Sequence, residues 1–121
     1  LGSVSGSEVF HILRNLKNSQ ASGWDDIPVF LVKQCASLIL KPLTHIVNVS
    51  LTSGEFPDLL KYSHVIPVYK KGDPSLMNNY RPIALLPSFS KIFEAAVLSK
   101  VTKFFDEVGC LSESQFGFRK R

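Results

Sequence analysis

Residues 65 to 95, reading VIPVYKKGDPSLMNNYRPIALLPSFSKIFEA, place a basic loop rich in Gly, Pro and Asn between two short apolar runs. The apolar runs predict strands over 64–69 and 83–86, and the loop predicts a hairpin that joins them. Pro67 and Pro82 cannot donate ladder hydrogen bonds, so we expect edge strands or irregular pairing. The result is a short, exposed hairpin that leads directly into an amphipathic helix.

Two helices are predicted near the N-terminus from caps and apolar periodicity. The first covers 8–17 after a cap at Ser7, with Glu8 in its first turn. The second covers 27–40 with Asp26 as its N-cap. Both carry apolar residues at helical spacing.

Two further helices are predicted on either side of the hairpin. One begins at Pro42 and stops at Gly54, and the other begins at Ser88 and stops at Gly109. The second of these should be the longest helix and the spine of the core, because its apolar stripe is wide. The stripe consists of Phe89, Ile92, Phe93, Ala96, Val97, Val101, Phe104, Phe105 and Val108. The fold class is therefore α+β and mostly helical, with several helices packed around a short basic β-hairpin.

The length and composition are those of one folded domain. A chain of 121 residues can bury about two thirds of its unfolded surface, and 45% hydrophobic with 20% charged residues is typical of a globular protein. We divide 1–121, as a single partial domain, into a helical part at 1–62, the hairpin at 63–87 and the long helix with a following motif at 88–121.

The charge is concentrated rather than spread. Of the net charge of +4, three positive charges belong to the terminal Arg119, Lys120 and Arg121, so the rest of the chain is close to neutral. Lys70 and Lys71 in the hairpin loop, with Arg81 beyond it, form a second cluster that suits a polyphosphate or a nucleic-acid backbone. The alternative interpretation is a solvated basic turn.

Other classes of protein find little support in the sequence. Cys35 and Cys110 lack the nearby Cys or His residues of a zinc site, and no Ser or Cys has a recognisable catalytic partner. The apolar runs are shorter than the ~18 residues of a membrane span, and the first residues given do not show a basic region followed by an apolar one. We expect no membrane contact and an intracellular location, in the nucleus or the cytoplasm. Asp25 and Asp26 suit a helix start better than a metal site, because a polar run precedes them.

Three motifs occur in an order that is similar to one family. GWDDIP at 23–28, the hairpin with NYRPI at 79–83, and QFGFRKR at 115–121 resemble the fingers of reverse transcriptases, the RNA-directed DNA polymerases of non-long-terminal-repeat retrotransposons. The first motif departs from the family's usual pattern, with Asp26 where a Gly is usual and Gln20 where a Lys is usual upstream. Because the resemblance covers nearly the whole chain, it implies a polymerase-fingers fold.

The resemblance also implies roles for particular residues. Arg81 matches the fingers Arg that neutralises the phosphates of the incoming nucleotide, and either Lys70 or Lys71 matches its Lys partner. Gln115, Gly117 and Arg119 match a motif that supports the template and the nucleotide pocket. The implied partners are an RNA template and a nucleoside triphosphate.

In the family, metal-binding aspartates lie in a palm that follows the fingers, and this sequence contains no such set. We therefore expect fingers with the palm absent, no catalytic residue, no cofactor in this chain and no polymerase activity alone, since the missing palm would bind Mg²⁺. Apolar surface left uncovered by that palm would favour self-association. Two alternatives stay open: a nucleic-acid-binding module without catalysis, and a helical protein-interaction domain.

Overall fold

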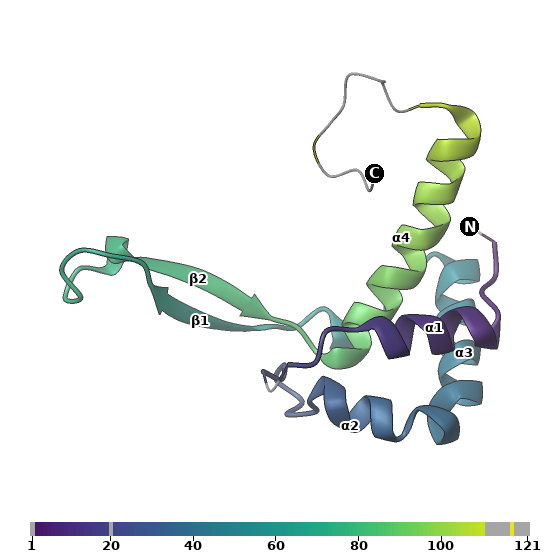
Figure 1. The fold of residues 1–121 in the computed structure, drawn as a ribbon, viewed down its shortest axis with the longest axis horizontal. Coiled ribbons are helices and arrows are strands. Elements are labelled where there is room, and N and C mark those ends of the chain that lie inside the picture. Colours follow the sequence, from purple (N-terminus) through teal and green to yellow (C-terminus); the bar gives the residue numbers. More distant parts are fainter. Residues whose placement is uncertain (1, 20, 111–116, 118–121) are drawn as a thin grey trace.

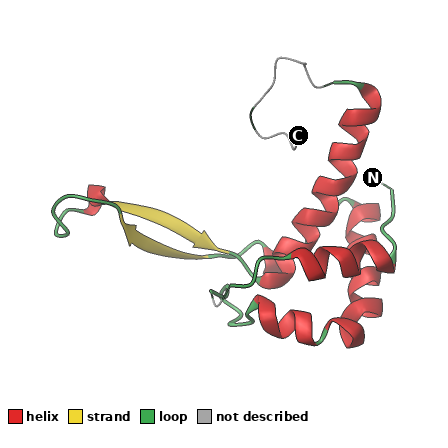
Figure 2. Cartoon of the chain, viewed as in Figure 1, coloured by secondary structure: helices red, strands yellow, loops and turns green. Residues whose placement is uncertain are grey.

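The computed structural model describes residues 2–19, 21–110 and 117, and it shows a helical body with a hairpin projecting from it (Figures 1 and 2). The predicted α+β, mostly helical class is confirmed. The elements in chain order are α1 (Gly6–Asn15), α2 (Val29–Gln34), α3 (Ala36–Ser53), a 3₁₀ turn (Asp58–Leu60), β1 (His64–Tyr69), a second 3₁₀ turn (Met77–Asn79), β2 (Tyr80–Leu85) and α4 (Ser88–Val108).

The core lies where α1, α2 and α3 meet the first half of α4. Its buried side chains come from all four helices, and Phe56 packs edge-on against Phe93 with ring centroids 5.7 Å apart. This burial accounts for the position of the body's helices, since apolar area removed from water is the main favourable term in folding. The buried cluster consists of Val4, Val9, Leu13, Val32, Ala36, Leu43, Val47, Leu51, Ile92, Phe93 and Ala96.

Helix α1 begins two residues earlier than the sequence predicted. The cap is Ser5 rather than Ser7: the Ser5 hydroxyl accepts a hydrogen bond from Glu8 N at 3.2 Å, and Ser5 N donates to Glu8 Oε2 at 2.7 Å. This reciprocal capping box satisfies two backbone donors at once. The spacing from Ser5 to Glu8 determines the start of the helix.

The predicted helix over 27–40 is wrong in both its start and its end. Asp26 is not an N-cap, because it has φ of 54°, whereas a cap residue needs extended backbone. Helix α2 starts only at Val29, and Cys35 separates it from α3. Pro42 does not open a helix but lies within α3, where its ring removes one backbone donor from the helix.

Helix α4 runs to its predicted end but is only partly a core helix. Gly109 and, after α3, Gly54 take left-handed backbone with φ of 67° and 74°, which confirms both predicted stops. The outer half of the predicted apolar stripe is exposed, with Phe104 at 56% and Val108 at 57%. The prediction fails there because this half of α4 extends past α1 and α3 (Figure 1), so no described helix covers it. Self-association through this surface stays a prediction.

The two strands pair regularly and form both edges of a two-stranded sheet, so of the two outcomes predicted from their prolines the structure shows edge strands. The register opposes Pro67 to Pro82, with Val68 opposite Arg81 and Tyr69 opposite Tyr80. In an antiparallel ladder every second pair exchanges no hydrogen bonds, and its N–H groups point away from the partner strand. Two prolines opposite each other fit such a pair without losing a ladder bond. They also remove donors from the outer edges, which disfavours pairing with another strand.

Candidate nucleic-acid interface

The three cations of the predicted site all lie on the projecting hairpin. Lys70 follows β1 directly, Lys71 lies in the loop, and Arg81 is the second residue of β2; all three are exposed. None of them forms an ion pair with a described carboxylate, because the ion pairs among the described residues involve only Lys61, Lys100 and Lys103. The only acidic residue of the hairpin is Asp73. The hairpin therefore presents a net positive surface to solvent.

The strand register places two of these cations on the same face. Val68 and Arg81 are directly opposite, so their side chains leave the ladder on one side. Lys70 N donates to Asn79 O at 2.7 Å, which continues the pairing by one step beyond β1. Because side chains alternate along a strand, Lys70 lies on the face of Val68 and is a diagonal neighbour of Arg81.

The loop between the strands is fixed by its own polar contacts. Asp73 accepts hydrogen bonds from Ser75 N at 2.9 Å and Ser75 Oγ at 2.7 Å, and these bonds hold the pKa of the Asp73 carboxyl below its usual value, the hydroxyl contributing most. Asn79 Nδ2 donates to Asp73 O at 2.8 Å. Gly72 has φ of 96°, a left-handed backbone that other residues rarely adopt. The loop is therefore preorganised around the two lysines.

A tyrosine pair that the sequence reasoning missed closes the end of the ladder. The rings of Tyr69 and Tyr80 make an edge contact with centroids 5.7 Å apart. Tyr80 Oη donates to Pro74 O at 2.8 Å, and Tyr69 Oη donates to Gly72 O, so both hydroxyls bind the loop backbone. Aromatic residues at both ends of the same loop are a signal that could have predicted this cross-strand pair.

The C-terminal part of the predicted site is not brought to the hairpin. Gln115 and Arg119 lie outside the described residues. Gly117 is exposed, and beyond its chain neighbours no atom lies within 4 Å of the position that its Cβ would occupy. The roles implied for these three residues stay predictions.

The described residues do not assemble a metal site. Within 2–19, 21–110 and 117, no group of three or more His, Cys, Asp or Glu side chains could hold an ion. Asp25 Oδ1 accepts a hydrogen bond from Ile27 N at 3.3 Å, which is a turn contact. Over the same residues, none of the helices has the length and apolar character that crossing a bilayer requires.

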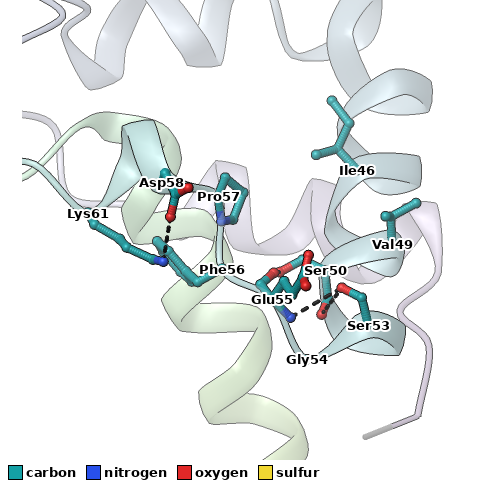
Figure 3. Close-up of a pocket in the computed structure, with 10 residues that line it drawn as sticks. All are labelled: Ile46, Val49, Ser50, Ser53, Gly54, Glu55, Phe56, Pro57, Asp58 and Lys61. Atoms are coloured by element: carbon teal, nitrogen blue, oxygen red, sulfur yellow. Dashed lines mark hydrogen bonds and ion pairs between the residues drawn. The ribbon is translucent and has the colours of Figure 1, made fainter.

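An open groove of about 730 Å³ lies on another part of the body, between α3 and the segment that follows Gly54 (Figure 3). Several of its polar groups are already paired: Lys61 Nζ lies 2.6 Å from Asp58 Oδ1, and Ser50 Oγ donates to Glu55 O at 2.6 Å. None of the predicted site residues lines the groove. A ligand would find few unpaired polar groups there, so the hairpin is the better candidate.

Comparison with known proteins finds relatives whose sequences align with nearly the whole chain. An RNA-directed DNA polymerase from the mobile element jockey of Drosophila melanogaster is 32% identical over 120 residues, covering 98% of this chain and 13% of the relative. A probable RNA-directed DNA polymerase from the X-element transposon of the same species is 31% identical over 113 residues, covering 93% of this chain and 12% of the relative. The chain thus spans about an eighth of the length of these curated relatives.

A third relative supports the same grouping. A probable RNA-directed DNA polymerase from the transposon BS of Drosophila melanogaster is 28% identical over 114 residues. No family model matches the chain. By sequence, the chain is similar over nearly its whole length to one segment of the RNA-directed DNA polymerases of non-long-terminal-repeat retrotransposons.

Proposed function

We propose that this chain forms the fingers segment of a retrotransposon reverse transcriptase and binds the RNA template and the phosphates of the incoming nucleotide. The observation that carries the proposal is the hairpin, which holds Lys70, Lys71 and Arg81 exposed on an ordered loop and its adjoining strand, without an ion pair to any described carboxylate. The names of the relatives add that the longer proteins are RNA-directed DNA polymerases. Such a polymerase takes an RNA template and nucleoside triphosphates.

The two cations on one face have complementary chemistry. Arg81 offers a planar guanidinium that can donate two parallel hydrogen bonds to phosphate oxygens, whereas Lys70 offers a mobile point charge. Because they are diagonal neighbours on one face, they can contact the same polyphosphate. This geometry favours Lys70 over Lys71 as the proposed phosphate-binding lysine. Lys71, in the loop, is free to contact a template backbone.

The proposal assigns binding, and no bond-forming step, to this segment. In this division of roles the described helices of the body support the hairpin at 63–87, which binds. Nucleotidyl transfer uses carboxylates that hold divalent ions, and in this family a palm supplies them. We therefore expect the purified chain to give no primer extension on an RNA template with magnesium and nucleotides. Template-dependent extension by a contaminant-free sample would contradict this division of roles.

The test of binding is a titration of the 121-residue chain with a nucleoside triphosphate and with single-stranded RNA at low and moderate salt. Arg81→Lys keeps the charge but loses the two-pronged contact, so we expect roughly 3- to 10-fold weaker triphosphate binding. Lys70→Ala should weaken it similarly, and Lys71→Ala should weaken RNA binding more than triphosphate binding. Binding of both ligands should fall as salt is raised.

Lys41→Ala is the matched control, because Lys41 is exposed on α3 and lies in the helical body. It removes one surface cation without touching the hairpin, so its affinity should equal that of the unmodified chain. If Lys41→Ala, Arg81→Lys and Lys70→Ala all bind as the unmodified chain does, the hairpin is only a solvated basic turn. The proposed function would then fail.

A further inference from the structure

The hairpin is attached to the body only through its two roots, as far as the described residues show. No residue from 64 to 85 is buried, and every residue of β1 is exposed. The root before β1 includes Leu59, and the root after β2 consists of Leu86 and Pro87. The direction of the hairpin therefore depends on what holds these two short segments.

One dipeptide, Gly23-Trp24, contacts both roots. Gly23 is buried so closely against the second root that a Cβ there would lie 2.4 Å from Pro87 N and 2.8 Å from the carbonyl carbon of Leu86. The neighbouring Trp24 donates its indole N–H to Leu59 O, in the first root, at 3.0 Å. Two roots that are separated by the whole hairpin in sequence are thus held by adjacent residues.

The loop that carries this dipeptide is itself fixed to the body. Asp26 N donates to Gly23 O at 3.2 Å, which closes the turn. At the end of the loop, the Ser88 hydroxyl donates to Ile27 O at 2.7 Å, and Ser88 is fully buried at the start of α4. A loop anchored in this way can hold the roots in place rather than follow them.

We propose that Gly23 and Trp24 form a clamp that sets the direction of the hairpin, and that they act as positioning residues for Lys70 and Arg81. The clamp follows from the geometry of the two roots; its effect on ligand binding rests on the proposed function. Trp24 acts here through its N–H rather than as a core residue, since it is 40% exposed. Gly23 acts because only a residue without a side chain permits the approach to Pro87.

The test measures the hairpin's direction separately from binding. Cysteine variants of Met77, at the hairpin tip, and Leu38, on α3, are highly exposed and can carry spin labels, with Cys35→Ser and Cys110→Ser to remove the native thiols. The unmodified background should give one narrow distance distribution between the labels. Gly23→Ala should shift and broaden it, and Trp24→Phe, which keeps a ring but loses the donor, should broaden it.

Gly6→Ala is the matched glycine control, because a Cβ at Gly6 meets only Thr44 Oγ1 at 3.9 Å. It should leave the distribution unchanged. Helical circular dichroism should be preserved in the two clamp variants. If Gly23→Ala loses that helical signal, Trp24→Phe alone decides the proposal.

The outcomes distinguish the clamp from the proposed function. A distribution in Trp24→Phe as narrow as in Gly6→Ala overturns the clamp, whatever the binding data show. If the unmodified chain binds no triphosphate or RNA, the proposed function fails, while a broadened distribution in the clamp variants still supports the clamp.

Discussion

The helical body and the hairpin are held together by different forces. In the body, side chains such as Leu13 and Ile92 are completely buried, and the apolar cluster draws on all four helices. Between residues 64 and 85 of the hairpin no residue is buried, and order comes from the strand ladder, the Tyr69–Tyr80 pair and the polar contacts of the loop. The body resembles a small globular domain, whereas the hairpin is a two-stranded sheet, which is marginally stable in isolation.

This difference separates stability from binding within one short chain. Burying a cation costs free energy because its hydration is lost, so side chains that bind phosphate have to stay accessible to solvent. The hairpin keeps its cations accessible and has no core of its own. The body holds the two roots of the hairpin in place. Substitutions in the body should therefore act on global unfolding, and substitutions in the hairpin on local opening and binding.

The largest expected effect is the difference in unfolding free energy between a Leu→Ala substitution in the body and one in the hairpin. Leu13→Ala removes a fully buried side chain and leaves a cavity, so the free energy of unfolding should fall by about 2–5 kcal/mol. Leu76→Ala truncates a side chain that is 56% exposed in the hairpin loop, and the loss should stay within about 0.5 kcal/mol. Urea denaturation followed by circular dichroism measures both.

Comparable losses of unfolding free energy in Leu13→Ala and Leu76→Ala would contradict the distinction between body and hairpin. They would mean that the hairpin loop contributes to the cooperative core. Similar m-values for both variants and the unmodified chain are needed as a control, because a changed slope would indicate a change in the denatured or native ensemble rather than in stability.

A smaller and local effect is expected at the hairpin's glycine. Gly72→Ala places a Cβ on a backbone with φ of 96° and within 2.7 Å of Asn79 Nδ2, which costs about 1–3 kcal/mol of local strain. The amide of Lys70, which donates to Asn79 O, should then exchange its hydrogen about 5- to 150-fold faster. Amide exchange measured by NMR would show this.

The same experiment contains its own control, since amides of the body report on global opening. Exchange at Val9 and Val47, both buried in helices, should be unchanged by Gly72→Ala. Faster exchange throughout the body would show that the two regions open together and would remove the distinction between them.

Features set by local sequence were predictable. Turn chemistry and the alternation of apolar residues predict the glycines that end α3 and α4, the whole of β1 and the exposed basic loop. Features that depend on distant residues were not predictable. Pro42 is tolerated within α3, whose apolar face is buried in the body, and the exposure of Phe104 depends on where the other helices end.

The candidate site shows the same limit. The cations of the hairpin were identified from the sequence, but the proposed choice of Lys70 over Lys71 needs the register that opposes Val68 to Arg81. The clamp at Gly23 could not be predicted either, because it depends on Pro87, which is distant in sequence. Spatial proximity of this kind has no signal in a single sequence.

The smallest expected effect is a pH dependence that differs between the regions. Glu8 in α1 accepts a hydrogen bond from Ser5 N and, less importantly, one from Lys100 Nζ at 2.9 Å, and these contacts lower its pKa from 4.5 to about 2. A depressed pKa in the folded state stabilises the fold above the unfolded value, and this contribution is lost as pH falls from about 4.5 towards about 2. Since the Glu8 side chain is 47% exposed, solvent screening limits the contribution to about 1 kcal/mol or less.

Glu8→Gln should therefore unfold at lower urea than the unmodified chain near neutral pH, and the difference should vanish in acid. Gln retains the capping geometry, so the variant isolates the charge. In the hairpin, Asp73→Asn removes a carboxyl that also has a lowered pKa but is fully exposed, and the urea midpoint should not change at either pH. Faster exchange of the Ser75 amide, which donates to Asp73 Oδ1, should be its only consequence. A urea midpoint that shifts with Asp73→Asn and not with Glu8→Gln would reverse the assignment of stability to the body and of local order to the hairpin.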